Sequence, residues 1–177
     1  MNTLTTIGYE GAELDSFIAT LRTSSVECVI DVRQLPLSRK RGFSKTVLRE
    51  ALVNAGISYV HLKSLGDPKP GRDAARAGRF DDFNKIYRKH LATPEAQDAL
   101  AQAGAASLAA QCCLLCYERD PQHCHRKVVA ESLSHAYNVD VLHLFVDNSV
   151  ETHGQRKQRR ISIGIGQGGA ATEPALW

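Results

Sequence analysis

The sequence has no apolar run long enough to cross a bilayer, which takes about 20 consecutive apolar residues in a helix. Its first ten residues, MNTLTTIGYE, also lack the basic start and the apolar core of a secretion signal. From both absences we expect a cytoplasmic protein with no membrane partner.

The chain also has no strong excess of positive or negative charge, and its number of cysteines is odd. The formal net charge of its 177 residues is only +3, which does not by itself indicate a nucleic-acid partner. Five cysteines without a secretion signal predict reduced thiols rather than a disulfide framework. The length and the hydrophobic content of 43% are typical of one globular domain with a substantial core.

Short apolar runs alternate along the chain with segments whose apolar residues recur every three or four positions. Strands are predicted at residues 4–7, 26–32, 57–62, 112–116 and 141–146, and helices at residues 14–21, 44–52, 80–91, from 94 onward and 128–137. Residues 63–79, rich in Gly, Pro and charge, are predicted to be a long irregular loop. This alternation predicts an α/β fold, with a mostly parallel sheet of about five strands and helices on both faces in a single three-layer domain.

The composition changes near residue 148. Residues 1–148 are predicted to form the α/β domain, and residues 149–177 a basic and then Gly-rich tail that we expect to be flexible. The basic residues of this tail are Arg156, Lys157, Arg159 and Arg160.

The most informative stretch is residues 111–129, where an apolar strand and a polar turn lead into Cys124, His125 and Arg126 at the start of a helix. In a parallel α/β sheet, ligands bind just beyond the carboxyl ends of the strands. A helix start adds unpaired N–H groups and a partial positive charge that favour an anion. The stretch therefore predicts an anion-binding pocket at this edge of the sheet.

Other polar side chains follow the remaining strands and should converge on the same edge. The predicted ligand-binding residues are Tyr9, Arg33, Ser38, Arg39, Cys116, Tyr117 and Arg126, and Asp67 and Arg72 follow the third strand. The arginine fork suits phosphate or carboxylate because it donates two parallel hydrogen bonds. We therefore expect an anionic, phosphate- or nucleotide-like ligand, and a hydrolase or transferase reaction.

The predicted catalytic residues are Cys124, His125, Glu118, Glu10 and Asp31. At a helix start beside His125, the pKa of the Cys124 thiol should be lowered, which would make it a nucleophile; the alternative is a structural thiol. Glu10 and Glu118 could approach each other, and such a pair would have a raised pKa suited to a general acid. The alternative is that these carboxylates form structural ion pairs, as Asp31 could with Arg33.

Two further functions remain open. Cys116, His123, Cys124 and His125 are residue types that bind zinc, but Cys113 and Cys116, although suitably spaced, should point to opposite faces of a strand. The leading prediction therefore includes no metal ion and no cofactor. A metal-binding or thiol-redox protein stays an alternative, and a reversible Cys116–Cys124 disulfide would indicate the latter. The other alternative is a nucleic-acid-binding module that uses residues 39–41 and the tail.

Several short segments together resemble a known family. They are residues 6–10 (TIGYE), 31–33 (DVR), 42–43 (GF), 59–62 (YVHL), 114–118 (LLCYE) and 124–126 (CHR). In this order, within residues 4–146, they resemble the family catalogued as domain of unknown function 488. The resemblance implies a single α/β domain and gives no established reaction. The DVR strand is also similar to one in rhodanese sulfurtransferases, but no matching six-residue active-site loop follows.

Overall fold

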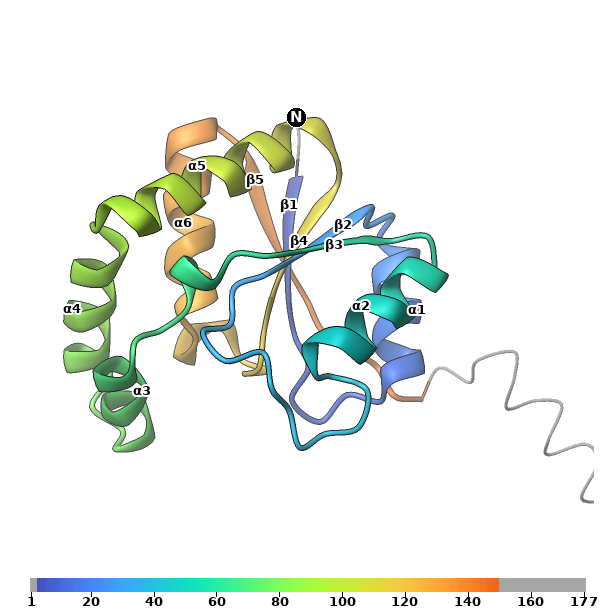
Figure 1. Cartoon of the computed structure of the whole chain (residues 1–177), viewed down its shortest axis with the longest axis horizontal. Helices are drawn as coiled ribbons and strands as arrows, with labels where there is room; N and C mark the ends of the chain where they lie inside the picture. Colours follow the sequence, from blue (N-terminus) through green and yellow to red (C-terminus); the bar gives the residue numbers. More distant parts are fainter. Residues whose placement is uncertain (1–2, 150–177) are drawn as a thin grey trace, which may run out of the picture.

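Five parallel strands form one sheet in the computed structural model, which describes residues 3–149 (Figure 1). The strands are β1 (Thr3–Gly8), β2 (Cys28–Asp31), β3 (Ser58–His61), β4 (Cys112–Cys116) and β5 (Asp140–Leu144). They lie in the order β3-β2-β4-β1-β5, and every neighbouring pair is parallel. The predicted α/β fold is confirmed, and the sheet is parallel throughout the described residues.

The burial of each strand follows its place in the sheet. The three inner strands β1, β2 and β4 are buried along nearly their whole length, whereas the edge strands β3 and β5 contain exposed residues. Strands covered on both faces are continuously apolar, which explains the run CCLLC in β4.

In the described part of the chain, six helices cover the two faces of the sheet (Figure 1). They are α1 (Leu14–Thr23), α2 (Lys45–Asn54), α3 (Lys69–Arg76), α4 (Phe80–Leu91), α5 (Pro94–Ala109) and α6 (His125–Tyr137). Apolar residues of α1 and α2 pack in one core with Cys113 and Leu115 of β4, whereas those of α3 to α6 pack in a second core with Leu114 and Cys116. The predicted three layers are confirmed, and Cys113 and Cys116 do lie on opposite faces.

The predicted loop over residues 63–79 is wrong. This segment contains a short 3-10 turn at Lys63–Leu65 and the helix α3. The prediction took proline and glycine as signs of a loop. Pro70, however, lies in the first turn of α3, where proline is tolerated. Gly71 is needed for packing, since a Cβ atom there would lie 2.1 Å from Oδ1 of Asp67.

The chain path creates a crevice at the carboxyl end of β4. The connections that leave β1 and β2 run through α1 and α2 on one face of the sheet, while β4 leads into α6 on the other face. β4 lies between β1 and β2, so neighbouring connections diverge on both of its sides. Ligands of parallel α/β proteins bind where connections diverge in this way.

The predicted tail, residues 149–177 with Arg156, Lys157, Arg159 and Arg160, lies outside the described residues apart from its first residue. Its boundary and its flexibility therefore stay predictions. Among residues 3–149, no helix combines the length and the apolar character needed to span a membrane.

Gly8, the last residue of β1, lets the segment after β4 approach closely. A Cβ atom at Gly8 would lie 1.8 Å from the carbonyl oxygen of Glu118, so Gly8→Ala would force the backbone apart. We expect this variant to lose about 3 kcal/mol of unfolding free energy, the upper end for overpacking, in urea denaturation.

Gly56→Ala is the control. Gly56 has a φ of +79°, and a Cβ atom added there would meet no atom within 4 Å, so only backbone strain, about 1 kcal/mol, should be lost. Equal losses in the two variants would contradict the close approach at Gly8.

Candidate functional site

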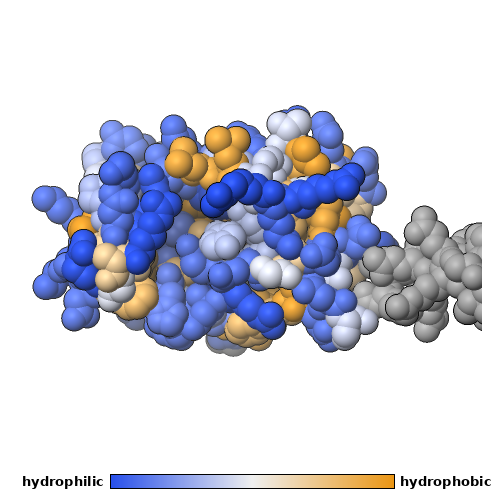
Figure 2. All heavy atoms as spheres, turned by 90° about the horizontal axis from the view of Figure 1, so that it is seen from below, coloured by the Kyte–Doolittle hydropathy of each residue, from blue (hydrophilic) through white to orange (hydrophobic). Residues whose placement is uncertain are grey.

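A cavity of about 450 Å³ lies at the carboxyl edge of the sheet, and we call it the carboxyl-edge pocket. Its lining comes from segments that follow four strands: Tyr9, Gly11, Arg33, Gln34, Leu35, Leu37, Ser38, Arg39, Lys40, Asp67, Arg72, Arg76, Cys116, Tyr117, Glu118 and His125. Figure 2 looks onto this edge, where hydrophilic side chains cover most of the surface and hydrophobic ones are exposed between them.

The structure brings together eight of the predicted site residues in this pocket, namely Tyr9, Arg33, Ser38, Arg39, Cys116, Tyr117, Glu118 and His125. Glu10, Asp31, Cys124 and Arg126 are absent from the lining. The strand ends thus meet at one cavity, which eight of the twelve predicted residues line and four do not; that this cavity binds an anion stays a prediction.

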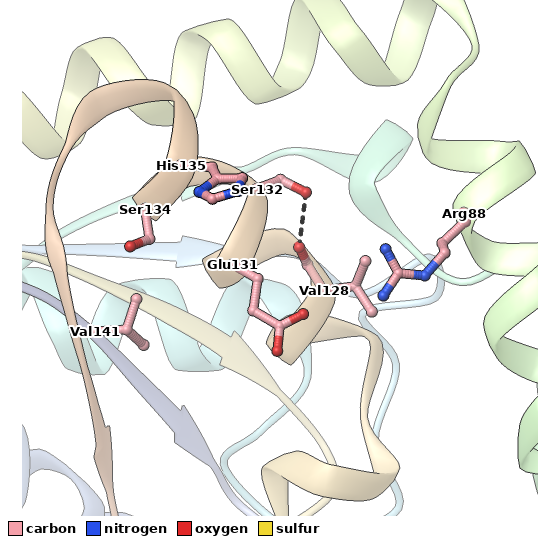
Figure 3. A pocket seen from close by; sticks show the side chains of 7 residues that line it. All are labelled: Arg88, Val128, Glu131, Ser132, Ser134, His135 and Val141. Atoms are coloured by element: carbon pink, nitrogen blue, oxygen red, sulfur yellow. Dashed lines mark hydrogen bonds between the residues drawn. The ribbon is translucent and has the colours of Figure 1, made fainter.

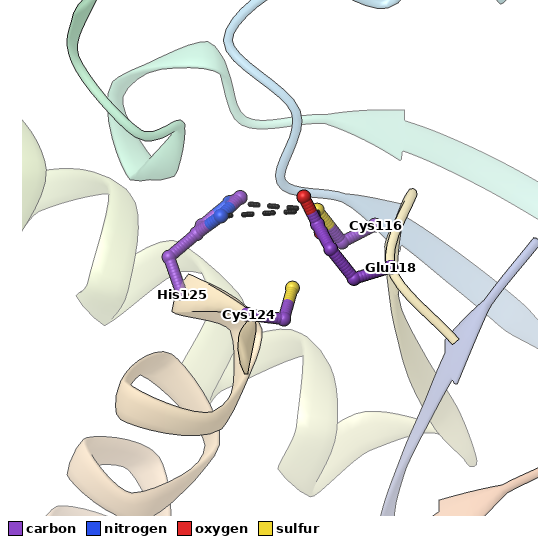
Figure 4. A group of neighbouring side chains, drawn as sticks. All are labelled: Cys116, Glu118, Cys124 and His125. Carbon is purple, nitrogen blue, oxygen red and sulfur yellow. Dashed lines mark hydrogen bonds between the residues drawn. The ribbon is translucent and has the colours of Figure 1, made fainter. Parts of the chain in front are cut away.

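Four side chains form a compact group (Figure 4), and three of them, Cys116, Glu118 and His125, line the pocket. We call Cys116, Glu118, Cys124 and His125 the floor cluster; one ligand atom from each lies within 4.8 Å of all the others. Cys116 Sγ is 3.1 Å from Oε2 of Glu118 and 3.8 Å from Nδ1 of His125. Two thiols, an imidazole and a carboxylate are thus gathered from two short segments, at the end of β4 and at the start of α6.

The imidazole of His125 has a fixed orientation. Its Nε2 lies 2.8 Å from the carbonyl oxygen of Val32, which can only accept a hydrogen bond, so Nε2 carries a proton. Burial opposes a second proton, but the hydrogen bond with Cys124, the negative charge of the cluster and the Val32 carbonyl outweigh it. They raise the pKa of His125 to about 9.

The predicted lowering of the Cys124 pKa is wrong. Cys124 is the N-cap of α6, and its Sγ accepts a hydrogen bond from the backbone N–H of Arg126 at 3.5 Å. Its side chain is nevertheless buried, and burial together with the neighbouring Cys116 raises the pKa of the Cys124 thiol well above its usual value. Cys116 is the thiol that lines the pocket, although burial raises its pKa too.

The carboxylates differ from the predicted acid pair. Burial alone would raise the pKa of Glu118, but hydrogen bonds from Cys124 and Cys116 and the charge of His125 outweigh it and lower that pKa. Glu10 is exposed outside the pocket, where its Oε2 accepts a hydrogen bond from the backbone N–H of Arg119 at 3.0 Å. Glu118 is therefore held as an anion and is not suited to the role of a general acid.

Asp31 and Arg33 form the structural ion pair that was the alternative to a catalytic role. Both are buried, with Arg33 Nη2 2.6 Å from Asp31 Oδ2 and Nε 2.8 Å from Oδ1. The remaining Arg33 nitrogen, Nη1, donates to the Tyr9 hydroxyl and to the Phe43 carbonyl. Tyr59 donates to Asp31 as well, at 2.6 Å. Most of the hydrogen-bonding capacity of this pair is thus used within the protein.

Arg126, predicted to bind an anion, is fully buried and lies outside the pocket lining. Its guanidinium donates to the backbone carbonyls of Glu118 and Arg119, the latter at 3.0 Å, and Nε lies 3.4 Å from the Thr6 hydroxyl. The prediction failed because a guanidinium in the first turn of a helix can point inward as readily as outward. Arg126 holds the segment after β4 in place.

Four cationic side chains surround the opening of the pocket, and we call Arg39, Lys40, Arg72 and Arg76 the rim cations. Arg39 is exposed, and its guanidinium has no hydrogen-bond or ion-pair partner within residues 3–149. Arg72 was expected at this edge but not as a ligand-binding residue, and Arg76 was missing from the predicted site, because the helix α3 was not predicted within residues 63–79. The one available signal was their position after the third strand.

Asp67, which was expected at this edge as a residue following the third strand, lines the pocket, although it was not among the predicted ligand-binding residues. Its side chain is buried, and Oδ1 has no hydrogen-bond partner among the described residues. Burial, which dominates over the opposing charges of His125 and Arg72, raises the pKa of Asp67 to about 6. A buried carboxyl oxygen without a partner can accept a hydrogen bond from a ligand or a water molecule.

A second cavity, of about 520 Å³, lies between α4 and α6, away from the carboxyl edge (Figure 3). It is lined by Arg88, Val128, Glu131, Ser132, Ser134, His135 and Val141. Its Ser132 hydroxyl donates to the Val128 carbonyl within the same helix. Although larger, this cavity holds none of the predicted site residues.

The doubly wound parallel sheet and the pocket at its switch point define an α/β protein whose architecture is typical of ligand binding. A sequence model of the family described as "Domain of unknown function DUF488" matches residues 13–133, more than half of the chain. The chain therefore belongs to the DUF488 family. No curated protein and no solved structure matches the chain.

Arg126→Met tests the structural role of this residue. We expect a loss of roughly 3 kcal/mol of unfolding free energy in urea denaturation, because two buried carbonyls lose a charged donor. Arg39→Met, which changes an exposed side chain without a partner, should leave stability within ~0.5 kcal/mol. An Arg126→Met protein as stable as the wild type would contradict the structural role.

Asp67→Asn tests the buried carboxyl through the pH dependence of stability. The pKa of Asp67 is about 6 in the folded protein and about 3.9 in an unfolded chain. The stability that this group contributes is thus present below about pH 4 and is lost as the pH rises through 6. At pH 7.5 the variant should be more stable than the wild type by roughly 1–3 kcal/mol in urea denaturation, and the difference should shrink toward pH 5.

The control for this experiment is Asp98→Asn, which changes an exposed carboxylate on α5 and should give no pH-dependent difference. A loss of stability in Asp67→Asn at pH 7.5 would show instead that the carboxylate makes a stabilising ion pair.

Proposed function

We propose that the protein binds an anionic small molecule, phosphate- or nucleotide-like, in the carboxyl-edge pocket and hydrolyses it or transfers a group from it. The observation that carries this proposal is the set of rim cations, which come from two separate segments and surround one cavity. Among them, the guanidinium of Arg39 has no hydrogen-bond or ion-pair partner in the described part of the chain.

The rim cations are available for a ligand because their present bonds are weak or leave donors free. Lys40 Nζ lies 3.3 Å from Glu13 and Arg76 Nη1 lies 3.7 Å from Asp73, and both ion pairs are at the surface. Surface ion pairs contribute at most about 1 kcal/mol, so a ligand with two negative charges can replace them. Arginine forks are also suited to the paired oxygens of a phosphate.

The pocket has an apolar side as well. Leu35 and Leu37, 58% and 78% exposed, line it together with the half-exposed ring of Tyr117. Exposed side chains of this size beside cations offer contact area for a flat apolar group. A nucleotide combines such a group with a phosphate, so it fits this lining better than a simple anion does.

The reaction class rests on the floor cluster. Cys116, Glu118 and His125 line the same cavity as the rim cations, so a bound ligand would lie between the two sets. A thiol, a carboxylate and an imidazole can move protons or activate a nucleophile, which hydrolysis and group transfer both require. Because Cys116 lines the cavity and Cys124 does not, Cys116 is the thiol that would act as the nucleophile.

The alternative of a nucleic-acid-binding module depends on residues 39–41 and on the basic tail. The pocket favours a small ligand, since it is concave and the carboxyls of Asp67 and Glu118 lie inside it. A continuous phosphate backbone would be bound better by an open basic surface. The experiment below therefore also measures the affinity for single-stranded DNA and its dependence on salt concentration.

Arg39→Ala is the variant that tests the proposal. We expect it to bind adenosine monophosphate and inorganic phosphate at least ~10-fold more weakly than the wild type in calorimetric titration, because a charged hydrogen bond contributes about 1.5–3 kcal/mol. Arg22→Ala, which removes an exposed arginine from α1, is the matched control and should keep full affinity.

Equal affinity in the two variants would overturn the role of the pocket opening. Tight binding of single-stranded DNA that falls steeply with salt, without binding of the nucleotide, would favour the nucleic-acid module instead.

A further inference from the structure

We propose that the floor cluster is a zinc-binding site in which Cys116, Glu118, Cys124 and His125 are the four ligands. The proposal rests on the mutual distances of their side chains, since one ligand atom of each residue lies within 4.8 Å of the others. It does not depend on the anionic ligand, and with zinc bound the floor cluster would act as a metal site instead of as the free proton-transfer and nucleophilic groups of the proposed function.

The distances fit tetrahedral zinc. Zinc binds sulfur at about 2.3 Å and nitrogen or oxygen at about 2.0–2.2 Å, which places its ligand atoms roughly 3.5–3.8 Å apart. Cys116 Sγ lies 3.8 Å from His125 Nδ1 and 3.1 Å from Glu118 Oε2. The largest separation in the cluster, at most 4.8 Å, exceeds this spacing by about 1 Å, so small side-chain adjustments would bring the four atoms around one ion.

The chain supplies the ligands from two short, well-anchored segments (Figure 4). Cys116 ends β4 and Glu118 follows two residues later, while Cys124 caps α6 and His125 is its first residue. Spacing along the chain does not reveal this site, because the only two-residue cysteine spacing, Cys113 to Cys116, joins opposite faces of the sheet. The second cysteine of the cluster is instead Cys124, which comes from the start of α6.

The surroundings of the cluster resemble the outer shell of a metal site. Nε2 of His125 is held by the Val32 carbonyl at 2.8 Å, so Nδ1 is the ring nitrogen left for a metal; Cys116 Sγ lies 3.8 Å from Nδ1 and 3.9 Å from Nε2. Histidine ligands of metals commonly donate the other ring N–H to a carbonyl in this way. The backbone N–H of Arg126 donates to Cys124 Sγ, and the start of α6 adds partial positive charge that stabilises a thiolate.

The ligand types select the metal. Two thiolates and an imidazole suit zinc, whereas calcium and magnesium take oxygen ligands almost entirely. The site also has one open side, because Cys116, Glu118 and His125 line the pocket while Cys124 lies behind them. Zinc bound there would place a positive charge at the wall of the pocket, and Glu118, as the only oxygen ligand, would be the one exchanged for a ligand oxygen.

The experiment uses the full chain, purified under reducing conditions, stripped with a chelator and reloaded with zinc. Metal analysis after gel filtration should find one zinc per chain. Cys116→Ser and Cys124→Ser should each weaken zinc binding more than about 100-fold, beyond the loss known for outer-shell partners. Cys113→Ser is the matched control, a buried cysteine three residues from Cys116 on the opposite face, and should retain one zinc.

Cobalt substitution of the wild-type chain keeps the proposal testable if a serine variant does not fold. Two thiolate ligands should give an intense sulfur-to-cobalt charge-transfer band in the near ultraviolet and the strong visible bands of a tetrahedral site. A wild-type protein that retains no zinc and shows no such band would overturn the proposal. Equal loss of zinc from Cys113→Ser and Cys116→Ser would overturn it as well.

Discussion

The hydrogen bonds of the buried Arg126 guanidinium hold the segment after β4 in the position on which the rest of the site depends. Its donors reach the carbonyls of Glu118 and Arg119, and its Nε lies near the Thr6 hydroxyl of β1. One side chain thus links α6 to β1 and to the segment that follows β4. A buried guanidinium is costly to desolvate unless its donors are bonded, so this arrangement tolerates little displacement. The position of Glu118, and with it the geometry of the floor cluster, follows from that constraint.

The chain topology places the pocket above this segment. Because β4 lies between β1 and β2 and its connection leaves by the opposite face, no described helix crosses the carboxyl end of β4 directly. The segment after β2 and the helix α3 supply the opening, and the end of β4 and the start of α6 supply the floor cluster. The result is a cavity with exposed cations in its lining and, in the same lining, one thiol, an imidazole and two carboxyl groups. This arrangement would orient the proposed ligand with its negative charge toward the cations and its reacting atoms toward the floor cluster.

The strands and the meeting of their carboxyl ends could be predicted because they depend on local patterns. The short apolar run CCLLC, for example, is typical of a strand that is covered on both faces. What a side chain contacts could not be predicted in the same way. Arg126 and Arg39 were both predicted to bind an anion because each follows a strand. In the structure Arg126 is fully buried against two carbonyls, whereas Arg39 is exposed. Cys124 lies at a helix start, where its pKa was expected to fall, but burial has the larger effect and raises it. The helix α3 was missed because its proline and glycine are typical of loops, although their places in the first turn are compatible with a helix.

The function proposed for this protein depends on the carboxyl-edge pocket being the place where a ligand binds. The most direct test is a titration of the isotope-labelled protein with adenosine monophosphate, followed by the backbone amide resonances in nuclear magnetic resonance. We expect the largest shifts at residues 33–40, 67–76 and 116–118, which surround the pocket. Shifts confined to the second cavity between α4 and α6 or to the basic tail, or no shifts at all at millimolar nucleotide, would contradict ligand binding in this pocket.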